Sequence, residues 1–205
     1  MTACTVVKEI ERLGFEISPQ KTEAIIFPAS AIGHGSYNLI IKNKEVPITS
    51  TLKYLGIILD SDWKFTQHFE KLYLKVNKII SYLREIMPNC RGPNKKKRKL
   101  YLHVVLSMIL YGAPVWSVSF EENRRAKTLM VRLMRRITQR VCCAYRTVSF
   151  VAASIIPGTP PLEFQARRLA ALYFKTRSAI NDEEENSPST IVKWKIEAKK
   201  QALLD

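Results

Sequence analysis

The periodicity of the sequence changes once, near residue 62, and this change constrains the fold more than any other feature. Before it stand four short apolar segments bounded by turn residues, which are typical of strands: residues 22–27, 37–42, 45–48 and 52–59. A helical repeat over residues 3–14 precedes them. From Thr66 to Ile86, apolar residues recur every three or four positions, which predicts an amphipathic helix. The expected fold is therefore α+β and mostly helical, with a small antiparallel sheet followed by a helical bundle.

Further helices are expected after Pro88, over residues 94–111, 121–142 and 162–180. Gly112 and Pro114 are expected to end the first of them. The predicted inner faces are Leu100, Val104 and Met108 of the first helix, Leu129, Leu133, Ile137 and Val141 of the second, and Ala166, Leu169, Ala170 and Tyr173 of the third. An acidic stretch at 181–190 is typical of a linker, and 191–204 of a short tail helix. These patterns predict a division into residues 1–62, 63–180 and 181–205.

Basic charge is concentrated in the helical part of the chain. The 205 residues carry a net charge of +15. Residues 64–177 contain 23 Lys and Arg against 5 Asp and Glu, a net of +18, so the rest is slightly acidic. Such a surface attracts polyanions, first nucleic acid and second an anionic membrane surface. No apolar run reaches the roughly 20 residues that span a bilayer, and four cysteines without framework spacing favour a reducing, cytoplasmic or nuclear compartment.

One basic cluster is the run Lys95-Lys96-Lys97-Arg98-Lys99, at the start of the helix expected over 94–111. Each cation there opposes the helix dipole at a cost of about a few tenths of a kcal/mol. The run therefore indicates a role other than helix stability. It can follow a phosphate backbone, direct nuclear import or form a solvated surface, and we favour contact with nucleic acid.

A second basic cluster lies in the helix expected over 121–142. Arg132, Arg136 and Arg140 recur every four residues and so form one continuous row. Like charges stacked in this way repel one another unless an anion lies across them, and guanidinium groups suit phosphate oxygens well. The row favours a nucleic-acid backbone as its ligand, and an acidic protein partner is the alternative.

The sequence offers little for a metal or catalytic site. Asp60 and Asp62 have a spacing that places two carboxylates on one face of a strand, as a two-metal site needs. They stand at a strand end, however, where aspartate commonly caps a turn, and we interpret them as turn residues. His and Cys residues show no zinc-ligand spacing. No catalytic residue and no metal ligand is therefore predicted.

Several short motifs follow one another along the chain: Ser18-Pro19-Gln20-Lys21-Thr22-Glu23, Lys53-Tyr54-Leu55-Gly56-Ile57-Ile58-Leu59-Asp60, Tyr111-Gly112-Ala113-Pro114-Val115-Trp116 and Tyr145-Arg146-Thr147-Val148-Ser149. In this order they resemble the C-terminal part of the reverse transcriptase of non-LTR (LINE-type) retrotransposons. The resemblance covers about residues 5–175. It implies that residues 1–62 are a palm remnant, that 63–180 form the thumb and connection region, and that 181–205 are a linker and tail.

The resemblance also implies roles for particular residues. It places the primer grip, which holds the growing 3′ end, at Lys53, Tyr54, Leu55 and Gly56. Tyr54 suits this role on its own pattern as well, because a glycine in a strand often marks a close approach by a ligand. The nucleic-acid-binding residues expected from the motifs and the two basic clusters are Lys21, Lys95, Lys96, Lys97, Arg98, Lys99, Arg132, Arg136 and Arg140.

Reverse transcriptases of this kind hold their metal ions with an earlier Asp and an Ala-Asp-Asp motif, both of which we expect to precede Met1. We therefore expect no cofactor in this chain and Mg²⁺ only in the full-length polymerase. The expected partners are RNA or the backbone of an RNA–DNA hybrid, and the catalytic part of the parent polymerase. On this hypothesis the chain resembles an RNA-directed DNA polymerase but is inactive alone. The alternatives are a non-catalytic helical protein that docks an acidic partner, and a membrane-surface protein that uses the helix at 66–88.

Overall fold

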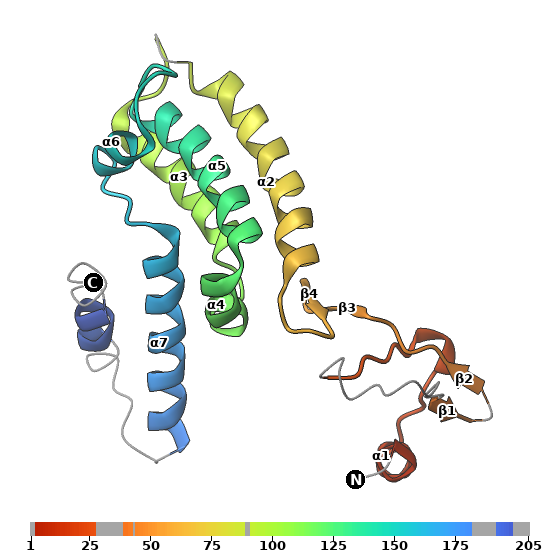
Figure 1. The fold of residues 1–205 in the computed structure, drawn as a ribbon. Coiled ribbons are helices and arrows are strands. Elements are labelled where there is room, and N and C mark those ends of the chain that lie inside the picture. The colour runs from red at the N-terminus through yellow and green to blue at the C-terminus, as the bar shows by residue number, and fades with distance from the viewer. Residues whose placement is uncertain (1–2, 28–38, 43, 89–90, 182–191, 199–205) are drawn as a thin grey trace. The chain divides into compact units, whose positions relative to one another are not determined.

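The computed structural model describes residues 3–27, 39–42, 44–88, 91–181 and 192–198. The chain divides into two compact units, residues 1–67 and 68–205. Figure 1 shows short strands in the first unit and long helices in the second. The predicted α+β, mostly helical class is confirmed.

The described residues of the first unit include one α-helix and two antiparallel pairs of strands. Helix α1 (Ala3–Arg12) is followed by Gly14 with φ +83°, which is the left-handed conformation that a glycine allows after a helix. Strands β1 (Leu39–Ile41) and β2 (Lys44–Val46) form one antiparallel pair, and β3 (Thr51–Tyr54) and β4 (Ile57–Asp60) form another. The small sheet layer is thus two separate two-stranded sheets.

Two strand predictions in this unit are wrong. The apolar run at 52–59 is a hairpin rather than one strand, because Leu55 and Gly56 both have positive φ, at +47° and +86°, and reverse the chain in a two-residue turn. The segment 22–27 forms only an isolated parallel bridge, between Ala24 and Ile48. The part of the strand predicted at 37–38 lies outside the described residues.

The second unit is made of helices around a shared core. Helix α2 (Thr66–Ile86), which begins in the first unit, is followed by α3 (Lys95–Ile109), α4 (Ala113–Glu122), α5 (Arg124–Val141), α6 (Phe150–Ile155) and α7 (Leu162–Asn181). Helix α3 packs on α5, α5 also contacts α4 and α6, and α7 packs along α4. Residues 192–198 are helical too, and Lys175 on α7 pairs with Glu197 at 3.3 Å.

An aromatic cluster joins α2 to α4. The ring of Phe69 lies 5.1 Å from that of Trp116 and 5.0 Å from that of Phe120, and all three side chains are buried. The indole nitrogen of Trp116 donates to the carbonyl oxygen of Tyr111 at 2.9 Å. Burying each of these rings contributes about 1.5–3 kcal/mol, and the contacts between the rings add to it. The cluster fixes α2, which carries one wall of the site described below.

Two predictions for the helices are corrected by the structure. Leu100 and Val104 are 60% and 44% exposed, whereas Leu102, Val105, Leu106 and Ile109 form the buried face of α3. This helix is apolar on two faces, so its periodicity does not show which one packs. On α7, Ala166 and Ala170 are buried as predicted, but Tyr173 is 52% exposed.

Helices α4 and α6 were missed by the sequence analysis. Gly112, with φ +68°, is the N-cap of α4, and Pro114 lies in the first turn, where a missing N–H costs nothing. These residues end α3 and begin α4. Ser149 begins α6, since its hydroxyl accepts from Ala152 N at 3.3 Å.

Membrane-spanning character is weak among the described helices. No one of them has both the length and the apolar composition needed to cross a bilayer, and only α3 and α4 taken together, bent by 83°, meet both criteria.

Candidate nucleic-acid interface

The four residues assigned to the primer grip lie together at the tip of the β3–β4 hairpin. Lys53 and Tyr54 end β3, and Leu55 and Gly56 form the turn. Tyr54 is 60% exposed and Leu55 is 72% exposed. Lys21 lies elsewhere in the first unit, exposed at the end of the 3-10 turn η1 (Pro19–Lys21).

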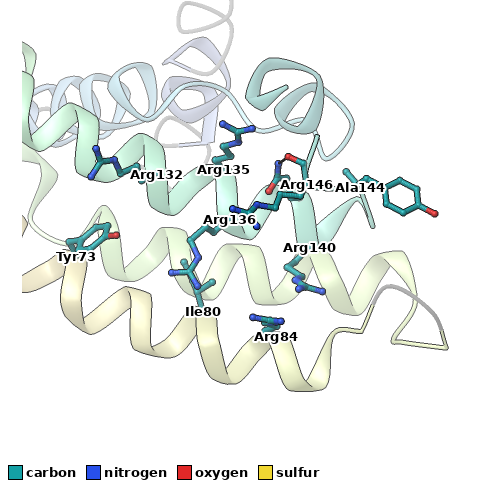
Figure 2. Close-up of a pocket in the computed structure, with 11 residues that line it drawn as sticks. Tyr73, Ile80, Arg84, Arg132, Arg135, Arg136, Arg140, Ala144 and Arg146 are labelled. Atoms are coloured by element: carbon teal, nitrogen blue, oxygen red, sulfur yellow. Dashed lines mark hydrogen bonds between the residues drawn. The ribbon is translucent and has the colours of Figure 1, made fainter. Parts of the chain in front are cut away.

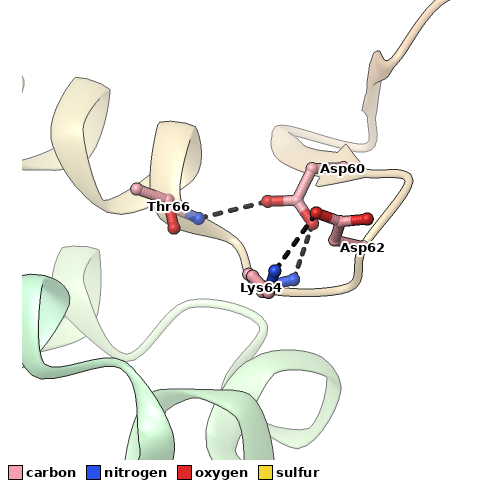
Figure 3. A network of polar contacts seen from close by, with 4 residues as sticks. All are labelled: Asp60, Asp62, Lys64 and Thr66. Carbon is pink, nitrogen blue, oxygen red and sulfur yellow. Dashed lines mark hydrogen bonds and ion pairs between the residues drawn. The ribbon is translucent and has the colours of Figure 1, made fainter. Parts of the chain in front are cut away.

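Asp60 has the capping role that its position predicted, whereas Asp62 lies in the turn and forms an ion pair (Figure 3). The Asp60 carboxylate accepts from Lys64 N at 2.6 Å and from Thr66 N at 3.2 Å, so it satisfies backbone donors at the start of α2. Asp62 pairs with the Lys64 ammonium at 3.2 Å. Across the described residues, no group of three or more His, Cys, Asp or Glu side chains could hold a metal ion.

The basic run at the start of α3 contains two kinds of side chain. Lys95, Lys96, Lys97 and Lys99 are exposed, and the Asn94 side chain caps the helix by accepting from Lys97 N at 3.1 Å. Arg98 is different, because only 3% of it is exposed.

The buried guanidinium of Arg98 binds backbone carbonyl oxygens. It donates to Pro93 O and to Arg140 O, both at 2.8 Å, and also to Pro88 O. These carbonyls lie after α2, before α3 and near the end of α5, so Arg98 joins the ends of three helices. The expectation that Arg98 contacts nucleic acid is therefore corrected: burial keeps its donors inside the protein.

The row Arg132, Arg136 and Arg140 lines a cavity of about 840 Å³ that we call the arginine groove (Figure 2). The groove lies between α2, α5 and the segment after α5. It is lined by Tyr73, Ile80, Arg84, Arg132, Arg135, Arg136, Gln139, Arg140, Ala144, Tyr145 and Arg146. Six of these residues are arginines and none is acidic, so the groove concentrates positive charge in a concave surface.

Acidic side chains instead meet the cations at the other end of α5. Arg125 pairs with Glu70 at 2.6 Å and Lys127 with Glu163 at 3.3 Å. Within the groove, Arg136 has a neutral partner, since it donates to the side-chain oxygen of Asn77. These two ion pairs offset part of the positive charge in the first half of α5, whereas no acidic residue is among those that line the groove.

Sequence reasoning found the row on α5 and missed the rest of the groove. Arg84 comes from α2, and no sequence pattern shows that it faces a helix about fifty residues later. Arg146 and Tyr145 belong to one of the ordered motifs, and neither was assigned to the nucleic-acid-binding residues. Arg135 is adjacent to the row in sequence, and the every-fourth-residue pattern excluded it.

Sequence comparison relates the chain to proteins of retrotransposable elements. It is 28% identical over 131 residues to a 115 kDa protein in the type-1 retrotransposable element R1DM of Drosophila melanogaster, which is 63% of this chain and 13% of that protein. It is 26% identical over 142 residues to the retrovirus-related Pol polyprotein from type-1 retrotransposable element R1 4 of Nasonia vitripennis, which is 68% of this chain and 36% of that protein. A third relative, named "Probable RNA-directed DNA polymerase from transposon BS" in Drosophila melanogaster, is 27% identical over 69% of this chain and 16% of its own length.

The chain thus spans between 13% and 36% of the length of these relatives. No family model matches it. No solved structure matches it significantly. The relatives nevertheless confirm the resemblance carried by the ordered motifs: the chain is similar in sequence to parts of proteins from type-1 retrotransposable elements and of an RNA-directed DNA polymerase from a transposon.

Proposed function

We propose that the chain is a C-terminal fragment of a retrotransposon RNA-directed DNA polymerase that binds the sugar–phosphate backbone of a template–primer without its own catalytic metal site. The observation that carries this proposal is the arginine groove, in which six guanidinium groups and no carboxylate line one concave surface. Guanidinium groups bind phosphate oxygens through paired hydrogen bonds. Contacts of this kind position a nucleic acid without reading its sequence.

The two units have different roles in this proposal. The helical unit corresponds to the thumb and grips the backbone through Arg132, Arg136 and Arg140. The β3–β4 hairpin corresponds to the primer grip, and its exposed Tyr54 contacts the primer 3′ end. Lys21 and the lysines of α3 add charge that attracts the nucleic acid from a distance.

Catalysis belongs to the parent polymerase in this proposal. Phosphodiester bond formation requires carboxylates that hold two divalent metal ions. We assign these ligands, and the Mg²⁺ that they bind, to the catalytic part of the parent polymerase, with which this chain would associate. Asp60 does not substitute for them, because both its oxygens already accept backbone N–H groups.

A salt titration tests the proposal. The full chain is titrated with an RNA–DNA hybrid that carries an unpaired RNA extension, at several salt concentrations. Backbone binding predicts that log K falls linearly with log salt, with a slope of about 0.9 for each phosphate neutralised in a duplex and about 0.7 in a single strand. A slope of several units supports the proposal. An affinity that does not change with salt contradicts the proposal and favours an acidic protein partner. In a parallel assay with anionic vesicles, binding to the vesicles but not to the hybrid contradicts the proposal and favours a membrane surface.

A further inference from the structure

The arginine groove presents its charges from two walls, and this shape decides which nucleic acid can enter it. Arg136 and Arg140 extend from α5, whereas Arg84 extends from α2 on the opposite side (Figure 2). Arginines on a single exposed helix could contact a polyanion of any width. A ligand that binds between two walls must be narrow enough to fit between them.

The size of the groove favours one strand over two. A volume of about 840 Å³ falls in the range of about 300–1,000 Å³ typical of pockets that enclose one small molecule. A few linked nucleotides of a single strand fit in such a space. A double helix is much wider and would touch only the arginines at the rim.

The spacing of the arginines suits one continuous backbone. Arg132, Arg136 and Arg140 follow one another at about 6 Å along the helix axis, from a rise of about 1.5 Å per residue. This repeat is comparable to the distance between successive phosphates of an extended strand. The row can therefore contact consecutive phosphates while Arg84 closes the other side.

Two tyrosines among the lining residues point to a ligand with free bases. Tyr145 follows α5 and is 80% exposed, and Tyr73 lines the groove from α2. Bases of a single strand stack on aromatic rings of this kind, next to cations that hold the backbone. Bases within a duplex already stack on one another and offer no face to a tyrosine.

We propose that the arginine groove binds single-stranded nucleic acid, the unpaired template segment rather than the paired hybrid, with one base stacked on Tyr145. This inference rests on the proposed function and specifies its ligand. Cations from both walls hold the phosphates, and the tyrosine adds an attraction that does not depend on salt.

Fluorescence anisotropy with the full chain tests the inference, using an unstructured RNA strand and a blunt RNA–DNA hybrid of equal length. Single-strand binding is expected to be the tighter. Tyr145→Ala is expected to weaken it by about 5-fold to 160-fold, the range that corresponds to the loss of one stacked base, while hybrid binding changes by less than about twofold. Arg84→Gln is expected to lower the single-strand salt slope by about 0.7.

Matched controls separate stacking from folding and from charge. Tyr145→Phe keeps the ring and is expected to bind RNA as the natural chain does. Tyr82 is also exposed, but it belongs to α2 and does not line the groove. Tyr82→Ala is therefore expected to leave RNA binding unchanged. Inorganic tripolyphosphate supplies the same phosphate charge without bases, and it is expected to compete poorly against RNA of equal charge.

The possible failures can be told apart. If the hybrid binds more tightly and Tyr145→Ala affects both ligands equally, the single-strand inference is overturned while the proposed function stands. If tripolyphosphate competes for the groove as well as RNA of equal charge does, the claim that a base stacks on Tyr145 is overturned. If neither nucleic acid binds with a salt-dependent affinity, the proposed function fails together with the inference.

Discussion

The lysine run of α3 and the arginine groove are similar in charge and different in structure. The lysines stand on the exposed first turn of one helix, around an Arg98 that is buried and bound to backbone carbonyls. The groove gathers arginines from two helices and the segment after α5 into one cavity. The lysines can attract a polyanion from any direction, whereas the groove can hold one in a defined position. The density of charge in the sequence therefore indicates the class of ligand, and the shape of the folded surface indicates where that ligand binds.

The largest effect is expected from removing the arginine row. The triple change Arg132→Gln, Arg136→Gln and Arg140→Gln should reduce the salt slope of template–primer binding by about two to three units, because each arginine neutralises about one phosphate. The matched change Lys95→Gln, Lys96→Gln and Lys97→Gln should weaken binding much less, since these side chains line no part of the groove. If the two triple variants lose equal affinity for the template–primer, the groove does not bind it more strongly than the lysines do, and the distinction between the two clusters fails.

Arg98 should matter for folding rather than for binding. In Arg98→Met the carbonyl oxygens of Pro88, Pro93 and Arg140 lose a buried donor. Because a hydrogen bond to a charged group contributes about 1.5–3 kcal/mol and three such bonds are lost, we expect the free energy of unfolding in urea to fall by about 3 kcal/mol or more. Lys97→Met, at an exposed neighbour, should change it by less than about 0.5 kcal/mol. A stable Arg98→Met variant with weakened binding would place Arg98 among the ligand contacts instead.

A carboxylate placed beside the groove should reduce binding more than one placed beside the lysines. Asn77→Asp keeps the shape of a side chain that already accepts from Arg136, and it converts this contact into an ion pair. We expect the salt slope to fall by about one unit. Asn94→Asp adds the same charge next to the lysines and keeps the helix cap, so only a small change is expected. The reverse order would show that the lysines carry the binding.

A smaller, pH-dependent effect is expected in α2, the wall that carries Arg84. His68 is buried, and the loss of hydration lowers its pKa below the ordinary value of 6.5. The unfolded chain therefore takes up a proton at a higher pH than the folded chain does. Through His68, the free energy of unfolding is therefore highest above pH 6.5, and it decreases as the pH falls from 6.5 toward the lowered pKa. Denaturation curves measured across this pH range should show that His68→Gln reduces the pH dependence of the free energy of unfolding.

The sequence predicted the parts of the structure that depend on local pattern. Helix α2 lies over residues 66–86, where its apolar stripe predicted it. Helix α5 ends at Val141, close to the predicted end, but it begins at Arg124 because residues 121–122 belong to α4. The four-residue repeat of arginines correctly indicated one continuous row. Asp60 caps the start of α2, as its position after a strand suggested.

The remaining features depend on contacts between distant residues or on turns hidden in apolar sequence. The turn at Leu55-Gly56 interrupts a mostly apolar run, in which Gly56 is the one residue typical of a turn. The packing of α3 selects one of two apolar faces, and only its neighbours decide which. Arg84 becomes part of the site because α2 lies beside α5. Arg98 looked like its lysine neighbours, and only the folded chain shows three carbonyl oxygens around it.

The central claim, that the arginine groove is where this chain holds nucleic acid, is tested most directly by photocrosslinking. The full chain is irradiated in complex with a template–primer whose unpaired RNA contains 4-thiouridine, and the attached peptides are identified by mass spectrometry. We expect crosslinks at Tyr145 and in the peptides that contain Tyr73 and Arg136. Crosslinks confined to residues 94–100, with none in the groove, would contradict the claim.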